Sequence, residues 1–281
     1  MNLVDRHLYV VLFVISSLSI FLYTLTGYYT ERIETISLIT SYGILFIIFI
    51  LIMFQRITPL IILILGLIFR LVFIISLPEL SQDFYRFIWD GNLQLIRINP
   101  YLYSPKDLIV KNDLFYLAND LFKGMGSLSN IHFSNYPPIS QWLYTLAAYF
   151  GGSNLNYSVL ILRITTLFFE ICNFYILYKI LNILKLPLKR IGWYFLNPLV
   201  IIELTGNLHG EGIMMFFFLL GVLFLHYNKI ILSSLMMAFS VGTKLITLIL
   251  IPLFLKNLGF KKSTTCFLLF ILFFHFYGYH I

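Results

Sequence analysis

The chain has 281 residues, of which 60% are hydrophobic and only 11% are charged, and its formal net charge is +7. Since soluble globular domains are about 25% charged, this composition excludes a soluble enzyme, a nucleic-acid-binding domain and a disordered chain. The excess of lysine and arginine is instead typical of the cytoplasmic connections of a multi-pass membrane protein. The two cysteines, Cys172 and Cys266, lie in apolar runs and resemble buried hydrophobic residues more than a disulfide or a metal site.

Long apolar runs predict membrane-spanning helices, because about 20 such residues cross a bilayer. One membrane-embedded domain over 1–281 is expected, with spans near 7–26, 36–54, 58–78, 157–183, 191–204, 212–227, 230–242, 245–256 and 263–279. Between the third and fourth spans, residues 79–156 form one large polar loop that carries interfacial helices. The predicted fold class is therefore all-α, a multi-pass transmembrane helical bundle.

The distribution of charge predicts the orientation of these spans. With the N-terminus in the cytoplasm, the inner connections carry the basic clusters 185–190 and 256–262 and, beyond Asp5, no acidic residue. The outer connections then receive Glu31, Glu34 and the acidic segment 79–156. The large loop is therefore expected to lie outside the cytoplasm, in a protein of the cell (inner) membrane that also contacts membrane lipid.

Several of the later apolar runs are too short to cross a bilayer alone. Residues 230–255 lie between two basic clusters, which predicts a hairpin of half-helices that turns near 242–244; the alternative is one tilted helix with an error elsewhere in the topology. Irregular backbone at that depth must be buried or line a wet cavity, so broken helices point to a site. The chain stops directly after an apolar run, which predicts a C-terminally truncated or partial chain.

The polar segment 78–105 carries the most informative pattern. Ser81 is the expected N-cap of a helix with Asp83 in its first turn. Asp83, Arg86 and Asp90 then share one face, and Arg86 can fully neutralise only one of the two acids. We expect this helix at the membrane surface, with its acids toward water and an opposite apolar face of Phe84, Ile88, Gly91 and Leu95. It is either a solvated ion-paired helix or a site whose free aspartate accepts a proton from a hydroxyl.

Further motifs follow in a specific order. They are Asp83-x-x-Arg86-x-x-Trp89-Asp90-Gly91, Asn99-Pro100-Tyr101, Tyr136-Pro137-Pro138, the block 195–203 that ends in Glu203, the block 206–212 with His209 and Glu211, and Thr243-Lys244-Leu245. Together they resemble the membrane-embedded glycosyltransferases of the GT-C type, above all the polyprenol-phosphate-mannose-dependent mannosyltransferases of bacteria. The resemblance covers roughly residues 58–256, and Arg97 stands where the family usually has a glycine.

The resemblance implies an inverting transfer of a sugar, above all mannose, from a polyprenyl phosphate to an extracytoplasmic glycan or glycolipid acceptor. By motif position Asp83 is the base, and Arg86 and Asp90 position Asp83 or the acceptor. Such a transfer needs one base and no general acid, because phosphate leaves as a stable anion, in contrast to glycoside hydrolysis. Neither a metal nor another cofactor is therefore expected.

The departing phosphate needs cations near the outer membrane face. Lys244 at the predicted hairpin turn is the first candidate and Arg163 is the second, although Arg163 can instead pair with Glu170, seven residues on. Glu203, His209 and Glu211 flank an outer loop, where they either bind sugar hydroxyls, orient the base or serve a structural role. Arg70 lies in the middle of a span and receives no role.

The remaining motif residues are predicted to shape the site. Tyr136-Pro137-Pro138 forms a rigid wall, and Tyr101 either stacks on a sugar ring or anchors the chain at the interface. Two alternatives to an active transferase remain. A transporter or lipid flippase also uses broken helices, but it would concentrate its ionisable groups in mid-membrane and show a repeat. An inactive truncated relative is the other.

Overall fold

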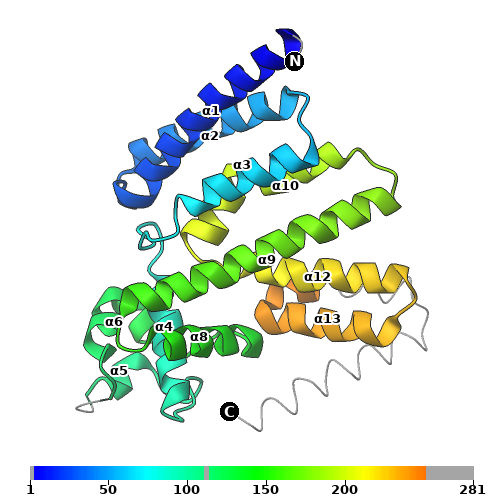
Figure 1. The fold of residues 1–281 in the computed structure, drawn as a ribbon. Helices are drawn as coiled ribbons and strands as arrows, with labels where there is room; N and C mark the ends of the chain where they lie inside the picture. The colour runs from blue at the N-terminus through cyan, green and yellow to red at the C-terminus, as the bar shows by residue number, and fades with distance from the viewer. Residues whose placement is uncertain (1–2, 111–113, 251–281) are drawn as a thin grey trace. The chain divides into compact units, whose positions relative to one another are not determined.

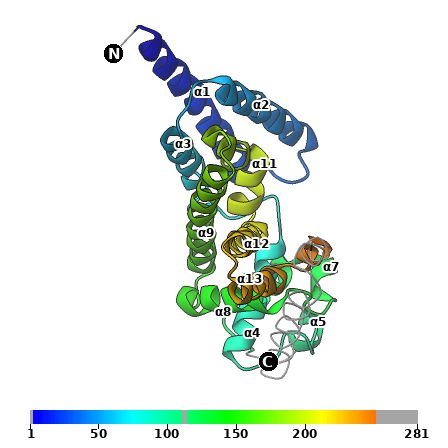
Figure 2. The ribbon, with the colours of Figure 1, turned by 90° about the vertical axis from the view of Figure 1, so that its right-hand side faces the viewer.

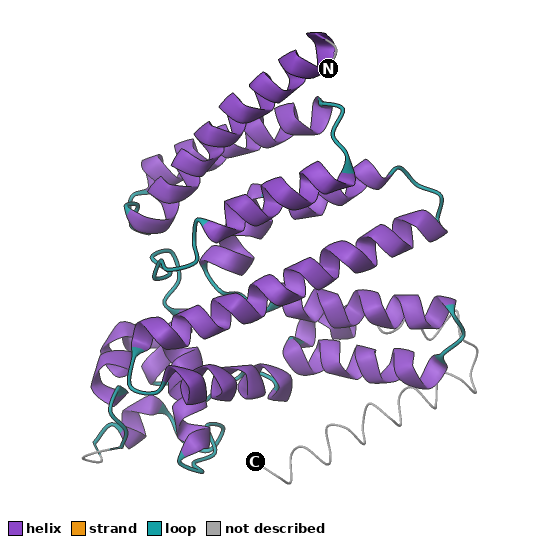
Figure 3. Ribbon diagram, in the orientation of Figure 1, coloured by secondary structure: helices purple, strands orange, loops and turns teal. Residues whose placement is uncertain are grey.

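A computed structural model describes residues 3–110 and 114–250 of the chain, and within these ranges it contains helices and no strand (Figure 3). The chain divides into two compact units. The first unit comprises Met1–Ser81 and Leu177–His209, and the second comprises Gln82–Ile176 and Gly210–Ile281. The predicted all-helical fold class is confirmed.

The first unit is built from three longer helices and a chain of short ones. These are α1 (Leu3–Tyr28), α2 (Thr35–Phe54), α3 (Pro59–Leu71), the 3₁₀-helix η1 (Leu188–Ile191), α10 (Gly192–Phe195), α11 (Pro198–Val200) and the π-helix η2 (Ile201–Gly206). Helix α1 packs against α2 and α3, and α3 packs against α10 and η2. The break between α10 and α11 falls at Asn197, because a residue before proline is disfavoured in the helical region.

Arg70 explains how this unit buries a positive charge. It lies on α3 and is completely buried. Its Nη1 donates to the carbonyl oxygens of Gly66 at 3.1 Å and Phe195 at 2.7 Å, and its guanidinium lies 4.2 Å from the centre of the Phe195 ring. The side chain therefore faces the interior of the helices and ties α3 to the end of α10, where the chain leaves the helical path.

The second unit contains the polar segment and a helical hairpin. Its elements are α4 (Asp83–Leu95), α5 (Pro105–Leu108), α6 (Ala118–Gly124), α7 (Gly126–Asn130), α8 (Pro138–Gly151), α12 (Glu211–His226), α13 (Ile230–Thr243) and the 3₁₀-helix η3 (Leu245–Leu250). Helix α9 (Leu155–Ile183) begins in this unit and ends in the first. Helices α12 and α13 lie side by side (Figures 1 and 2), and α4 packs against both α6 and α8.

Among the residues that the structure describes, three helices are long and apolar enough to cross a membrane, namely Val10–Tyr28, Thr35–Phe54 and Leu155–Ile183. A fourth span results if Pro198–Gly206 and Glu211–His226 are counted as one broken helix. Helices α3 and α13 are apolar but shorter. The chain is therefore a helical membrane protein.

The boundaries of the spans differ from those predicted. The expected span 58–78 ends as a helix at Leu71, because the hydrogen bonds after it tighten to a three-residue spacing, as from Phe73 N to Arg70 O. Helix α13 ends at Thr243, where the sequence predicted a turn, and Lys244 has extended backbone. The predicted span 263–279 and the part of 245–256 beyond Leu250 lie outside the described residues.

Candidate active site

Helix α4 begins at Asp83, but its start differs from the prediction. The N-cap is Gln82, which makes no capping hydrogen bond through its side chain. Ser81 is buried, and its Oγ lies 3.3 Å from Nε2 of His209, so its hydroxyl is directed to a histidine and is not a cap. The side chain of Asp83 is exposed in the first turn, where a negative charge suits the helix dipole.

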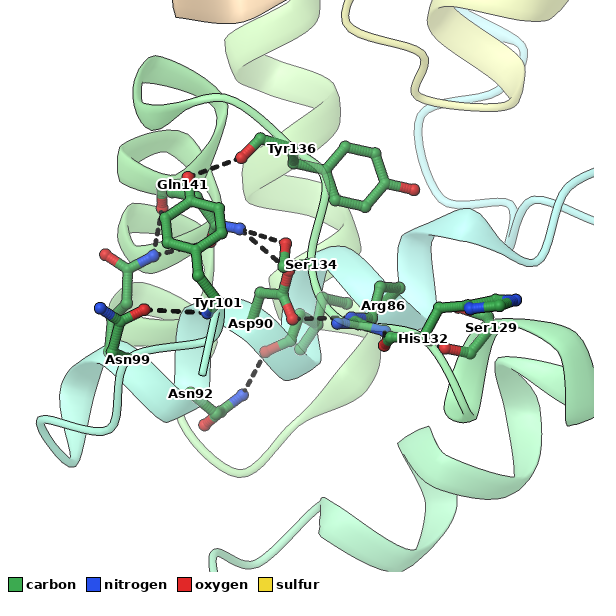
Figure 4. Close-up of polar contacts among 12 residues, drawn as sticks. Arg86, Asp90, Asn92, Asn99, Tyr101, Ser129, His132, Ser134, Tyr136 and Gln141 are labelled. Carbon is green, nitrogen blue, oxygen red and sulfur yellow. Dashed lines mark hydrogen bonds and ion pairs between the residues drawn. The ribbon is translucent and has the colours of Figure 1, made fainter. Parts of the chain in front are cut away.

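Asp90, two turns further along α4, is completely buried. Its carboxylate accepts hydrogen bonds from Arg86 Nε at 2.7 Å, Ser134 Oγ at 2.5 Å and Gln141 Nε2 at 2.9 Å (Figure 4). Burial raises the pKa of Asp90, and the Arg86 charge and the hydrogen bonds from Ser134 and Gln141 oppose this. The prediction that both acids of the helix face water is therefore wrong for Asp90, because a buried ion pair takes it into the protein.

The Arg86 guanidinium serves the same buried network. Besides Asp90, its Nη1 donates to the backbone carbonyl oxygens of Ser129 at 2.8 Å and His132 at 2.9 Å. Of the two acids that the sequence offered to this arginine, the structure gives the ion pair with Asp90. Arg86 thereby fastens α4 to the end of α7 and to the segment that follows it.

The motif residues around this pair serve mainly for packing. Gly91 is required because a Cβ atom there would lie 2.2 Å from the carbonyl oxygen of Tyr144 on α8. Trp89 is completely buried and contacts the rings of Phe115 and Phe122. The predicted apolar face of α4 is buried apart from Leu95, which is 40% exposed at the helix end.

Two separate motifs of the sequence meet beside this helix. Asn99 Oδ1 accepts a hydrogen bond from the backbone N–H of Tyr101 at 2.8 Å, and the Tyr101 hydroxyl donates to the carbonyl oxygen of Tyr136 at 2.7 Å. Pro138 is the first residue of α8, a position that proline favours. Figure 4 shows the carbonyl group of Tyr136 turned toward Tyr101 and its ring turned away. Tyr101 is thus an anchor for the Tyr136 segment.

Tyr136 lies among the acids of the second unit. Burial is the main reason that the pKa of its phenol is raised, and the charges of Asp83, Asp90 and Glu211 raise it further, whereas Arg86 lowers it. Burial and the charge of Asp90 likewise raise the pKa of Tyr101. The charges of Asp83 and Glu211 therefore both act on Tyr136, whose place in the wall of a site stays a prediction.

The predicted phosphate-binding cations have different surroundings. Nζ of Lys244 forms an ion pair with Oε1 of Glu211, and both side chains are partly exposed, at 44% and 38%. Arg163 and Glu170 lie seven residues apart on α9, and both are completely buried. Only Lys244 of the two predicted cations is open to a ligand from outside.

A second polar cluster lies in the first unit and is centred on Glu203. Its carboxylate accepts hydrogen bonds from the Tyr42 hydroxyl at 3.2 Å and Asn207 Nδ2 at 3.1 Å, and it lies 3.2 Å from Nδ1 of His209. The sequence pointed to Glu203 and His209 but missed Tyr42, 161 residues away in an apolar span, and it indicated Ser81 only as an N-cap. A tyrosine in an apolar run carries no spacing signal that would link it to Glu203.

The fold and these polar clusters define a helical membrane protein with ionisable side chains gathered at its short, broken helices. A family model described as alpha-(1->6)-mannopyranosyltransferase, N-terminal domain, matches residues 22–258. The chain belongs to this family and is a glycosyltransferase of mannosyltransferase type, which confirms the resemblance seen in the sequence. Comparisons with curated proteins and with solved structures gave no match, so the assignment rests on the family model.

Proposed function

We propose that the chain transfers mannose from a polyprenyl-phosphate donor to a hydroxyl group of an extracytoplasmic glycan or glycolipid, with inversion at the anomeric carbon. The family match supports a mannosyltransferase. The charge asymmetry of the sequence supports an N-terminus in the cytoplasm of a cell-membrane protein and a site outside it.

The chemistry requires one proton acceptor. The acceptor oxygen forms a bond to C1 of mannose, the bond from C1 to the phosphate oxygen breaks with its electron pair, and the hydroxyl proton passes to a base. The matched family is described by an alpha-(1->6) product. Since inversion reverses the anomeric configuration, an α-linked product requires a β-linked donor, and we propose that linkage for the substrate.

We assign the base to Asp83. The observation that carries this assignment is the contrast along one helix: Asp83 is exposed at the start of α4, whereas Arg86 is engaged with the buried Asp90. The ion pair holds α4 in place, which positions the carboxylate of its first turn. The charge of Asp83 raises the pKa of Tyr136, which belongs to the predicted wall of the site.

Lys244 is assigned to the donor phosphate. Its side chain is 44% exposed, and its charge is balanced by Glu211, a carboxylate that a phosphate anion can replace as its partner. A cation at the departing phosphate stabilises the negative charge that develops during transfer. The complete burial of Arg163 favours its alternative role within the helices.

The proposal is tested with purified protein in detergent or in vesicles. Polyprenyl-phosphate mannose, glucose and arabinose are each offered with a short mannose oligosaccharide as acceptor. We expect transfer from the β-mannose donor alone, and NMR of the product should show an α-(1->6) linkage. Product from glucose or arabinose in preference to mannose, or no product from a folded protein, would overturn the proposed donor.

A further inference from the structure

The Glu203 cluster contains a hydrogen-bonded arrangement to which the proposed transfer assigns no role. Nδ1 of His209 lies 3.2 Å from Glu203 Oε2, and Nε2 of the same ring lies 3.3 Å from the Ser81 hydroxyl. Serine, histidine and glutamate thus form a hydrogen-bonded row, with the imidazole in the middle. A carboxylate at one ring nitrogen fixes the tautomer, so that Nδ1 donates and Nε2 accepts.

The backbone at this cluster is unusual in two independent respects. Glu203 lies on the π-helix η2, a form that occurs mostly as single turns and often at functional sites. Leu208, between Asn207 and His209, has φ +62°, a left-handed conformation that is costly for a bulky side chain. This bend lets both neighbours of Leu208 reach the same carboxylate. Strain of this kind is often retained for function.

Two members of the row are partly accessible, whereas Ser81 is buried. The side chains of His209 and Glu203 are 25% and 34% exposed, unlike the completely buried carboxylate of Asp90. Three hydrogen-bond donors keep Glu203 in position, namely Tyr42, Asn207 and His209. A fixed, accessible imidazole acceptor is suited to recognising an O–H group.

We propose that the Glu203–His209 pair is a recognition site for one non-reacting sugar hydroxyl, and that the Ser81 hydroxyl occupies this position when the sugar is absent. Nε2 of His209 accepts the hydrogen bond from the sugar, and Glu203 holds the ring with Nδ1 as the donor. This inference rests on the proposed function, because it takes the ligand to be a mannosyl donor or its acceptor glycan. Sites that hydrogen-bond a substrate hydroxyl reject analogues without it.

The test is a double-mutant cycle that combines His209→Ala in the protein with the removal of one hydroxyl at a time from the sugar. Monodeoxy analogues of the mannosyl donor and, in a separate arm, of the acceptor are measured for binding and for transfer with wild-type protein and with His209→Ala. At the recognised hydroxyl, the deoxy analogue should lose about 10- to 100-fold in affinity with the wild type. His209→Ala should lose a similar factor in affinity for the parent sugar. For that deoxy analogue, the affinity of His209→Ala should equal the affinity of the wild type.

Equal, additive losses at every hydroxyl in both arms would overturn the inference, because a merely structural histidine affects all analogues alike. His226→Gln, an exposed histidine at the end of α12, is the matched control and should leave every ratio unchanged. If His209→Ala does not fold, Glu203→Gln serves instead, because it removes the fixed tautomer and should weaken the same discrimination.

Ser81→Ala tests whether the Ser81 hydroxyl competes with the sugar hydroxyl for His209. It should leave kcat unchanged and lower KM, because a competing hydroxyl has been removed, and a large loss of kcat would contradict the role given to Ser81. Binding distinguishes this inference from the proposed function. If binding shows coupling between His209 and one sugar hydroxyl but no transfer occurs, the inference stands and the proposed transferase activity is refuted. If transfer occurs without such coupling, the proposed function stands and the inference is refuted.

Discussion

Two carboxylates in this protein each interact with three donors, but their surroundings differ. Asp90 interacts with Arg86, Ser134 and Gln141 and has no exposed surface. Glu203 interacts with Tyr42, Asn207 and His209 but is 34% exposed, and its histidine is directed onward to Ser81. The number of hydrogen bonds therefore does not separate structure from function.

The difference lies in what a ligand can still reach. In the Asp90 network the carboxylate, the arginine and the glutamine form their hydrogen bonds inside the protein, and removing the Asp90 carboxylate leaves the buried Arg86 charge without its partner. In the Glu203 cluster the carboxylate and the imidazole are partly exposed, and the row ends at the Ser81 hydroxyl, which another hydroxyl can replace. We therefore expect variants of the first network to change stability and variants around the second to change substrate recognition.

The largest effect on transfer is expected outside both networks, at the exposed Asp83. Asp83→Asn keeps the size of the side chain but removes the proton acceptor, so kcat should fall about 10³-fold, while membrane insertion and thermal unfolding stay as in the wild type. Transfer is measured with polyprenyl-phosphate mannose. Glu79→Gln, in the turn before the helix, is the control, and an Asp83→Asn protein with full activity would remove the proposed base.

The largest effect on stability is expected in the Asp90 network. Asp90→Ala leaves the Arg86 charge buried without its partner, so the free energy of unfolding should fall by about 3–5 kcal/mol. Thermal unfolding in detergent measures this. The double variant Arg86→Met, Asp90→Leu should recover much of the loss, because it removes both charges together. If Asp90→Ala unfolds like the wild type, the contrast between the two carboxylates is not one of stability.

Sequence reasoning could predict the composition of these networks only in part. Helical periodicity placed Arg86 and Asp90 on one face of α4, but it could not decide which acid is buried, because Ser134 and Gln141 lie 44 and 51 residues further along the chain. The ordered motifs identified the family without showing that Tyr101 contacts the backbone of Tyr136. Apolarity located α3 but not its end at Leu71, which depends on local tightening of the backbone.

A smaller effect is expected at the partly exposed ion pair of Lys244 and Glu211. Lys244→Gln should raise KM for the lipid-phosphate donor about tenfold, whereas Glu211→Gln should lower it, because the lysine is then released to the phosphate. Exposed ion pairs contribute about 0–1 kcal/mol, so unfolding should hardly change in either variant. Lys229→Gln, an exposed lysine before α13, is the control. Changes of KM in the same direction for both variants would argue that the intact pair, and not the lysine, serves the donor.

The smallest effect is expected at Arg97, which ends the helix that carries both aspartates. Its φ of +60° lies in the left-handed region, and hydrogen bonds from Arg97 N to Gln94 O and from Ile98 N to Leu93 O close the helix in the manner usually served by glycine. Arg97→Gly should therefore stabilise the protein by about 1 kcal/mol, offset in part by the greater freedom of glycine in the unfolded chain.

Thermal unfolding measures the gain from Arg97→Gly, and transfer should keep its wild-type kcat and KM. This variant stabilises the C-terminal end of α4 and changes neither the Asp90 nor the Glu203 carboxylate, so it separates the stability of α4 from the roles of the two acids. If the variant is more stable but loses donor affinity, the arginine side chain itself contacts the substrate. Its presence where the family usually has a glycine would then reflect recognition, and the strain at φ +60° would be maintained for that purpose.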